Sequence, residues 1–210
     1  TFEAYKSLPA FFDASKHEVT QYKTKSKDGT LVPYFMVSRK DMKNDGTNPT
    51  LVYAYGGFEV ALSPFYAATY GASWLENGGV FVLANIRGGG EYGPKWHQNG
   101  ILEKRQNVFD DLYAVSEDLI TKKVTSPEHL GVMGGSNGGL LVGVAFTQRP
   151  DLYNAVVCQV PLLDMQRYNK LLAGASWMGE FGNPDVPEEW EFIKKYSPYH
   201  NLREGVDYPE

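Results

Sequence analysis

A serine between glycines is the best-placed nucleophile in this sequence. Residues 130–141 read Leu-Gly-Val-Met-Gly-Gly-Ser-Asn-Gly-Gly-Leu-Leu, with Ser136 near the centre. A short apolar run precedes the Gly-x-Ser-x-Gly pattern, and a stretch with helical character, residues 140–148, follows it. This order of strand, serine turn and helix is typical of a nucleophile elbow. The turn strains the serine backbone, and the neighbouring chain leaves no room for a Cβ on either side, which explains the glycines.

The residues around Ser136 can also supply an oxyanion hole. The free N–H groups and positive dipole end of the following helix favour an oxyanion, and the backbone N–H of Asn137 is the expected first donor. The second donor usually follows an early strand, where residues 53–58 read Tyr-Ala-Tyr-Gly-Gly-Phe. The hydroxyl of Tyr55 can fill that role. The position of Tyr55 is equally consistent with a tyrosine at the end of a strand whose hydroxyl simply faces water.

A serine hydroxyl needs a base, and the base needs an acid that orients it. In a fold with a nucleophile elbow the chain order is serine, acid, histidine. His17, His97 and His129 precede Ser136, and His200 follows it without a strand to present it. We therefore expect His200 to be a loop histidine near Ser197. Either the acid and base of the triad lie beyond residue 210, or the protein is not a hydrolase.

Composition narrows the classes of protein that fit. The 210 residues suffice for one domain, and the 42% apolar and 21% charged content is that of a globular protein. A net charge of −5 argues against nucleic-acid binding, and no apolar run approaches the ~20 residues that cross a membrane. One cysteine, Cys158, excludes an internal disulfide and a cysteine-based zinc site. We expect no metal ion or cofactor, and a cytoplasmic location with the periplasm as the alternative.

From residue 50 onward, strand and helix patterns alternate. This order predicts an α/β fold with a mostly parallel sheet and helices on both faces. The expected strands are residues 50–55, 79–86, 130–133 and 155–160; the expected helices are 67–76, 108–122 and 140–148, with two further helical segments within 165–196. Ahead of them, Asp28-Gly29 predicts a hairpin of residues 17–26 and 31–39. No further strand pattern follows residue 160, so the fold is expected to be truncated before its last strands.

Several long motifs occur in an order that resembles the prolyl oligopeptidase family. They are Tyr-Gly-Gly-Phe at 55–58, Asn-Ile-Arg-Gly-Gly-Gly-Glu-Tyr-Gly at 85–93, Trp-His at 96–97, Gln-Asn at 106–107, Phe-Asp-Asp at 109–111, Gly-Gly-Ser-Asn-Gly-Gly-Leu-Leu at 134–141, Gln-Arg-Pro-Asp-Leu at 148–152 and Lys-Tyr-Ser-Pro at 195–198. The likeness runs from about residue 17 to 202. Asn137 is more similar to the prolyl enzymes than to the oligopeptidase B branch, which usually has alanine there.

This resemblance implies an α/β-hydrolase peptidase domain, partly contained in residues 17–210, with residues 1–16 as a linker from a preceding domain. It implies a full-length chain with a β-propeller that excludes large substrates, and short proline-containing peptides as substrates. Ser136 would be the nucleophile, with the Tyr55 hydroxyl and the Asn137 N–H as oxyanion donors. We expect residues 1–210 alone to be inactive.

The resemblance also implies a pocket for proline. Trp177 would stack on the pyrrolidine ring, and Phe58, Phe181 and Leu162 would form other walls; relatives often carry tyrosine in place of Phe181. Trp177 and Phe181 are four residues apart, so on one helix they would share a face. A flat, uncharged pocket suits a ring that has no N–H to donate. From the pattern alone, aromatic residues at this spacing are more typical of a core.

Three alternatives remain open at the level of sequence. Gly88, Gly90 and Gly93, with Asp110 and Asp111 about twenty residues later, formally fit a dinucleotide-binding fingerprint. No helix pattern starts within that motif, so no helix N-terminus would face a pyrophosphate. The other two alternatives are a different serine hydrolase of the same fold and a non-catalytic α/β-hydrolase-like binding fragment.

Overall fold

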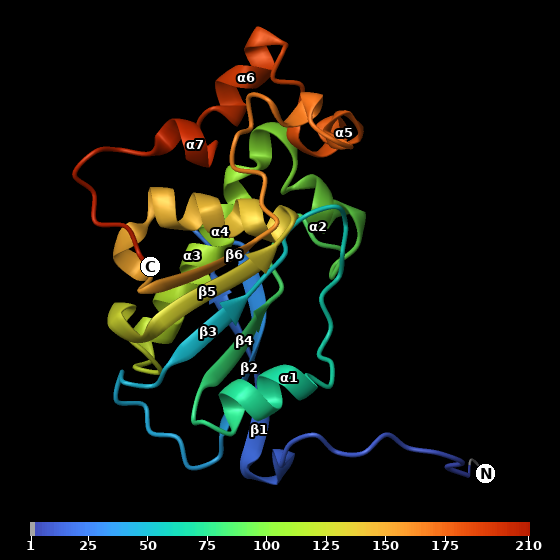
Figure 1. The fold of residues 1–210 in the computed structure, drawn as a ribbon, viewed down its shortest axis with the longest axis vertical. Coiled ribbons are helices and arrows are strands. Elements are labelled where there is room, and N and C mark those ends of the chain that lie inside the picture. The colour runs from blue at the N-terminus through green and yellow to red at the C-terminus, as the bar shows by residue number, and fades with distance from the viewer. Residues whose placement is uncertain (1–2) are drawn as a thin grey trace.

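A six-stranded mixed sheet lies at the centre of the protein in the computed structural model, which describes residues 3–210 (Figure 1). Residues 1 and 2 of the expected linker lie outside the described residues. The strands are β1 (His17–Lys25), β2 (Leu31–Arg39), β3 (Thr50–Tyr53), β4 (Val80–Ala84), β5 (Leu130–Gly135) and β6 (Ala155–Gln159). Their spatial order is β1-β2-β4-β3-β5-β6.

The sheet has a parallel part and an antiparallel edge. Strands β4, β3, β5 and β6 are parallel neighbours, as the alternation of strand and helix patterns predicts. The β1–β2 hairpin is antiparallel, and β2 pairs antiparallel with β4. The turn of the β1–β2 hairpin contains Gly29 at φ +86°, a conformation that glycine adopts at no steric cost. The predicted hairpin and the mostly parallel sheet are thus both present.

Helices cover both faces of the sheet. The α-helices are α1 (Ala68–Tyr70), α2 (Pro94–Gln98), α3 (Gln106–Thr121), α4 (Asn137–Gln148), α5 (Met178–Phe181), α6 (Pro187–Ile193) and α7 (Pro198–Asn201). Side chains of β4 alternate between two apolar cores: Val80, Val82 and Ala84 pack with α3 and α4, whereas Phe81 and Leu83 face the side of α1. The buried parallel strand is apolar on both faces for this reason.

Two predicted regions differ in detail. The helix expected at 67–76 is a single turn, α1, continued by a π-helix, Gly71–Leu75. The region 165–196 is not two helices but several short ones: the 3-10 helices Tyr168–Lys170 and Gly174–Trp177, then α5 and α6. Gly182 at φ +93° follows α5, and Pro187 begins α6, so local backbone chemistry interrupts the helical pattern.

The edge at β6 is partly covered. The N–H of Val156 donates to the carbonyl of Glu210 at 2.7 Å, and the N–H of Glu210 donates to the carbonyl of Asn154 at 3.1 Å. This is the bond pattern of a parallel ladder. Residue 210 therefore occupies the position beside β6 that the sequence pattern leaves unpaired.

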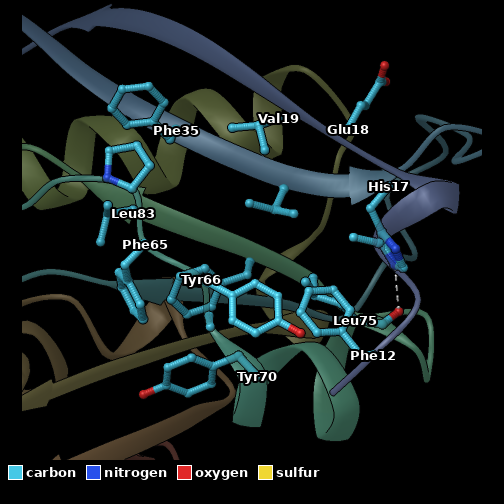
Figure 2. Close-up of a pocket in the computed structure, with 15 residues that line it drawn as sticks. Phe12, His17, Glu18, Val19, Phe35, Phe65, Tyr66, Tyr70, Leu75 and Leu83 are labelled. Carbon is cyan, nitrogen blue, oxygen red and sulfur yellow. Dashed lines mark hydrogen bonds between the residues drawn. The ribbon is translucent and has the colours of Figure 1, made fainter. Parts of the chain in front are cut away.

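An apolar pocket of about 220 Å³ lies on the α1 face of the sheet (Figure 2). Phe12 and Tyr66 stack there with ring centroids 5.3 Å apart, and the Nε2 of His17 is 3.1 Å from the carbonyl oxygen of Leu75. Its lining does not include Ser136 and contains no serine, threonine or cysteine. No helix within residues 3–210 is long and apolar enough to span a bilayer.

Candidate active site

The chain makes a tight turn at Ser136, between β5 and α4. Strand β5 ends at Gly135, helix α4 begins at Asn137, and Ser136 between them has φ 58° and ψ −117°. Such a conformation is rare for a residue with a Cβ and typical of strained functional turns. The structure therefore contains the strand, serine turn and helix that the sequence predicts.

Close backbone contacts explain two of the glycines around the turn. A Cβ on Gly134 would lie 2.2 Å from the carbonyl oxygen of Gly138, so the strand and the helix start could not approach each other as they do. A Cβ on Gly138 would lie 2.9 Å from the carbonyl oxygen of Ala54. These contacts bring β5, the first turn of α4 and the end of β3 together.

Three neighbouring parallel strands deliver the predicted site residues to one edge of the sheet. Tyr55 follows β3, Ser136 follows β5, and Leu162 follows β6, and these strands are adjacent in the sheet. The carboxyl ends of parallel strands are the usual location of ligand sites in α/β proteins.

The Tyr55 side chain lies beside Ser136. Partial burial raises the pKa of the Tyr55 phenol, and the neighbouring Ser136 side chain opposes that shift to a smaller extent. A raised pKa keeps the phenol protonated at neutral pH, as a hydrogen-bond donor requires. The backbone N–H of Asn137 belongs to the first turn of α4, where N–H groups have no acceptor within the helix. The two predicted oxyanion donors thus adjoin the same serine.

The Asn137 side chain points into the protein rather than toward substrate. It is fully buried, its Oδ1 accepts a hydrogen bond from the Arg105 guanidinium, and its Nδ2 donates to the backbone carbonyl of Tyr55 at 2.6 Å. A Cβ on Gly57 would lie 2.5 Å from the Asn137 Nδ2. The double glycine after Tyr55 therefore permits close approach of this loop to α4.

Buried charges that the sequence did not predict lie behind the two predicted donors. The Nη1 of Arg105 donates to the Oε1 of Glu180 at 2.9 Å, and the same oxygen accepts the Phe58 N–H at 2.9 Å. The Nε2 of His97 is 2.7 Å from Glu180 Oε2. Burial lowers the pKa of Arg105, and Glu180 opposes that shift. His97 belongs to the Trp-His pair at residues 96–97, but no sequence spacing links it and Arg105 to Glu180, which lies far along the chain.

A pocket of about 350 Å³ opens beside Ser136, and its lining includes Leu162 and Trp177. Trp177 ends a 3-10 helix and Phe181 ends α5, so the single helix face that their spacing suggested does not exist. Phe181 is fully buried and packs edge-to-face on Phe58, with ring centroids 5.6 Å apart. Neither phenylalanine lines the pocket; Phe181 also packs on Tyr168, which does.

No histidine of the described chain shares a hydrogen bond with Ser136. His200 in α7 bonds through Nδ1 to Ser197 Oγ at 2.8 Å and through Nε2 to Gln166 Oε1 at 3.1 Å. Both ring nitrogens are therefore occupied. His200 lies near Ser197 as predicted, but in the short helix α7 rather than in a loop. His17 and His97 bond to other groups, and no such bond is formed by His129 within residues 3–210.

The glycine-rich loop at residues 88–93 supports the loop that carries Tyr55. A Cβ on Gly88 would lie 2.5 Å from the Gly56 carbonyl oxygen, and one on Gly90 would lie 2.3 Å from the Glu59 carbonyl oxygen. Asp111, a candidate ribose ligand, is fully buried and bonded to Arg87. Helix α2 begins only at Pro94 and has five residues. These contacts argue against the dinucleotide alternative.

Within residues 3–210, no three His, Cys, Asp or Glu side chains cluster as metal ligands would.

Comparison with known proteins gives one consistent result. The model of the prolyl oligopeptidase family matches residues 66–210. A peptidase of Sinorhizobium fredii is 60% identical over 208 residues, covering 99% of this chain and 29% of that relative. The prolyl endopeptidase of Elizabethkingia meningoseptica is 44% identical over 208 residues, again 99% of this chain and 29% of the relative.

A solved structure gives the same result. A post-proline cleaving enzyme from Rickettsia typhi matches with a TM-score of 0.93 and 50% identity, over 99% of this chain and 30% of that one. The predicted α/β-hydrolase fold is thereby confirmed. The chain spans less than a third of the length of these relatives.

Proposed function

Since the chain belongs to the prolyl oligopeptidase family, we propose that the full-length protein is a serine peptidase that cleaves short peptides on the carboxyl side of proline. The observation that carries this proposal is the strained turn at Ser136, with φ 58°, between β5 and α4. The Tyr55 hydroxyl, the first turn of α4 and an apolar pocket adjoin this serine.

In the proposed mechanism, the Ser136 Oγ attacks the carbonyl carbon of the scissile peptide bond while a histidine base takes the hydroxyl proton. The carbonyl oxygen becomes an oxyanion that accepts hydrogen bonds from the Asn137 N–H and the Tyr55 O–H. The intermediate then collapses, the C–N bond breaks, and the leaving amine takes the proton from the histidine. Water then hydrolyses the resulting ester on Ser136 by the same steps. This releases the peptide fragment that ends in the new carboxylic acid, and it restores the Ser136 hydroxyl.

The pocket beside Ser136 suits a proline side chain. Leu162 and Trp177 offer apolar surface, and the pyrrolidine ring brings no N–H that the pocket must satisfy. The indole of Trp177 supplies a flat face for stacking. In this proposal Phe181 and Phe58 support the wall from behind.

We propose that the histidine and its orienting acid follow residue 210, and that a β-propeller in the full-length chain limits substrates to short peptides. Support comes from the relatives, which are more than three times as long as this chain, since it covers 29% of each. The histidines within residues 3–210 also have other partners or none, as described above.

Labelling with a fluorophosphonate tests the nucleophile. The full-length protein is treated with the probe, digested, and the adduct mapped by mass spectrometry. We expect the phosphonyl group on Ser136, and no adduct in the Ser136→Ala variant. Hydrolysis of Gly-Pro and Gly-Ala chromogenic substrates then tests the specificity. An adduct on another residue would refute the nucleophile, and equal rates on the two substrates would refute the preference for proline.

A further inference from the structure

A buried ion pair lies directly behind the loop that carries Tyr55. Arg105 is fully buried, and the Glu180 side chain is 5% exposed. They come from separate segments, since Arg105 immediately precedes α3 and Glu180 lies in α5. Neither residue lines the pocket at Ser136, so neither is placed to touch the reacting atoms.

The pair holds the loop at two points. Through Asn137, Arg105 reaches the first point: its Nη2 donates to the Asn137 Oδ1, and the Asn137 Nδ2 donates to the Tyr55 carbonyl at 2.6 Å. Glu180 holds the second point, where its Oε1 accepts the backbone N–H of Phe58 at 2.9 Å. The loop residues 55–58 are thus connected at both ends to one ion pair, and the same pair holds the side chain of the first residue of α4.

His97 completes the hydrogen bonding of the carboxylate. Its Nε2 lies 2.7 Å from Glu180 Oε2, whereas Oε1 serves Arg105 and Phe58. The His97 side chain is 20% exposed and belongs to α2, at the outer end of the set. With both carboxylate oxygens bonded, Glu180 has little freedom to rotate away from the loop.

Stability alone is a weak reason for such a pair. Removing two charges from water costs several kcal/mol per ion, and apolar residues of similar volume often stabilise a protein as well or better. Within residues 3–210 the Arg105 Nε also has no hydrogen-bond partner, which adds to the cost of burial. Geometry is a better reason, because the contacts of this pair converge on the segments that carry the two oxyanion donors.

We propose that Arg105 and Glu180, supported by His97, are positioning residues that fix the oxyanion hole. They set the distance between the Tyr55 hydroxyl and the Asn137 N–H by holding the loop 55–58 against the start of α4. This inference rests on the proposed attack by Ser136. It does not depend on the preference for proline, because any acyl or phosphonyl group on Ser136 places an oxygen in the same hole.

The test uses the full-length protein and the second-order rate of fluorophosphonate labelling at Ser136. The main variant is Arg105→Met/Glu180→Met, which removes both charges and leaves neither unpaired. We expect labelling to slow roughly tenfold to a hundredfold, since small displacements of catalytic groups have effects of this order. On a peptide substrate, kcat should fall while KM changes little, because the pocket lining is intact.

Two further variants test the same proposal even if the double variant does not fold. His97→Ala removes a partly exposed group and should slow labelling roughly threefold to tenfold, about the value of one hydrogen bond. His97→Gln, whose amide can donate to Glu180, should restore the rate to within about twofold of the original. The matched control is Tyr34→Phe. This change removes a 2.6 Å hydrogen bond from the hydroxyl of the buried Tyr34, in β2, to Asp118, in α3.

The outcomes separate the two proposals. Labelling of the double variant and of His97→Ala at the original rate would overturn the positioning role. Equal slowing by Tyr34→Phe would also overturn it, because the effect would then follow from lost stability. A protein that is labelled at Ser136 but does not cleave after proline would refute only the proposed specificity. A protein that is not labelled at Ser136 would refute both.

Discussion

Ser136 stores conformational strain that its surroundings must hold. Its φ of 58° is among the few positive values at residues other than glycine in the described chain, and such conformations cost on the order of 1–3 kcal/mol. The hydrogen bonds of the Ser136 N–H to the Gln159 carbonyl, at 2.9 Å, and of the Leu140 N–H to the Ser136 carbonyl, at 3.1 Å, hold the turn from both sides. The strained geometry presents the hydroxyl at the carboxyl edge of the sheet.

At the same scale, the Tyr55 hydroxyl is a proposed oxyanion donor, and the removal of this one oxygen atom tests that role. Tyr55→Phe in the full-length protein should lower kcat by roughly 10²–10³, as loss of one oxyanion donor does, with little change in KM. Steady-state hydrolysis of a Gly-Pro chromogenic substrate measures both constants. Tyr53→Phe, two residues earlier in β3, is the matched control and should leave them unchanged. An unchanged kcat for Tyr55→Phe would exclude its hydroxyl from the mechanism.

Trp177 lines the pocket beside Ser136, and its proposed role is to stack on the proline ring of the substrate. Trp177→Ala should raise KM for proline substrates roughly tenfold or more, because truncation removes the apolar face of the pocket. Activity toward a Gly-Ala substrate should change much less, so the ratio of kcat/KM values for the two substrates is the measurement. Trp190→Phe, at an indole that packs on His200 with centroids 5.1 Å apart, is the control. A ratio that does not fall would mean that Trp177 belongs to the core rather than to recognition.

The residues that sequence could and could not predict differ in how they are linked. Ser136, Asn137 and Tyr55 stand in local motifs whose backbone chemistry fixes where they lie relative to a strand end. Arg105 and Glu180 are 75 residues apart and meet only when the segment that leads into α3 packs against α5. No periodicity or spacing signals such a pair, which is why the buried charges behind the site were missed. The pocket roles of Phe58 and Phe181 remain predictions, with the structure placing both behind the lining.

Among the elements, strands were predicted better than short helices. A buried parallel strand such as β4 is apolar on both faces, so its pattern survives in a single sequence. The region 165–196 contains aromatic residues at helical spacing, yet Gly174, Gly182 and Pro187 divide it into short segments. A Cβ on Gly174 would lie 1.7 Å from the Tyr168 carbonyl oxygen, so the chain folds back on itself too tightly there for a continuous helix. The spacing of aromatic residues does not reveal such a local turn.

The junction of β5 and α4 should be the least tolerant element. In Gly134→Ala, the new Cβ would meet the Gly138 carbonyl oxygen, at 2.2 Å, so the helix start must move away from the strand. We expect a loss of about 1–3 kcal/mol in the free energy of unfolding and slower labelling of Ser136. Gly179→Ala in α5, where a Cβ would have no neighbour within 4 Å, is the control and should be neutral or slightly stabilising. Denaturant unfolding of both variants measures this, and equal stability of the two would contradict the close packing.

At the scale of the whole molecule, residue 210 extends the sheet at the β6 edge. It pairs with β6 in a parallel ladder. The two pockets lie in different regions: the site pocket lies beside Ser136, and the aromatic pocket of Figure 2 lies on the α1 face. The described residues thus include the proposed nucleophile, the proposed oxyanion donors and a pocket beside Ser136, and none of the histidines among them bonds to Ser136.

That arrangement makes a prediction about the segment of residues 1–210 expressed alone. It should hydrolyse a Gly-Pro chromogenic substrate negligibly, because an oxyanion hole without a base retains only about 10³–10⁴-fold acceleration over water in well-studied hydrolases. The full-length protein, assayed in parallel, should turn over the same substrate readily. Rapid turnover by the segment would mean that a base lies within it, and His200 would be the first candidate. His200→Ala in the full-length protein distinguishes these cases: its ring already bonds to Ser197 and Gln166, so we expect kcat to be unchanged.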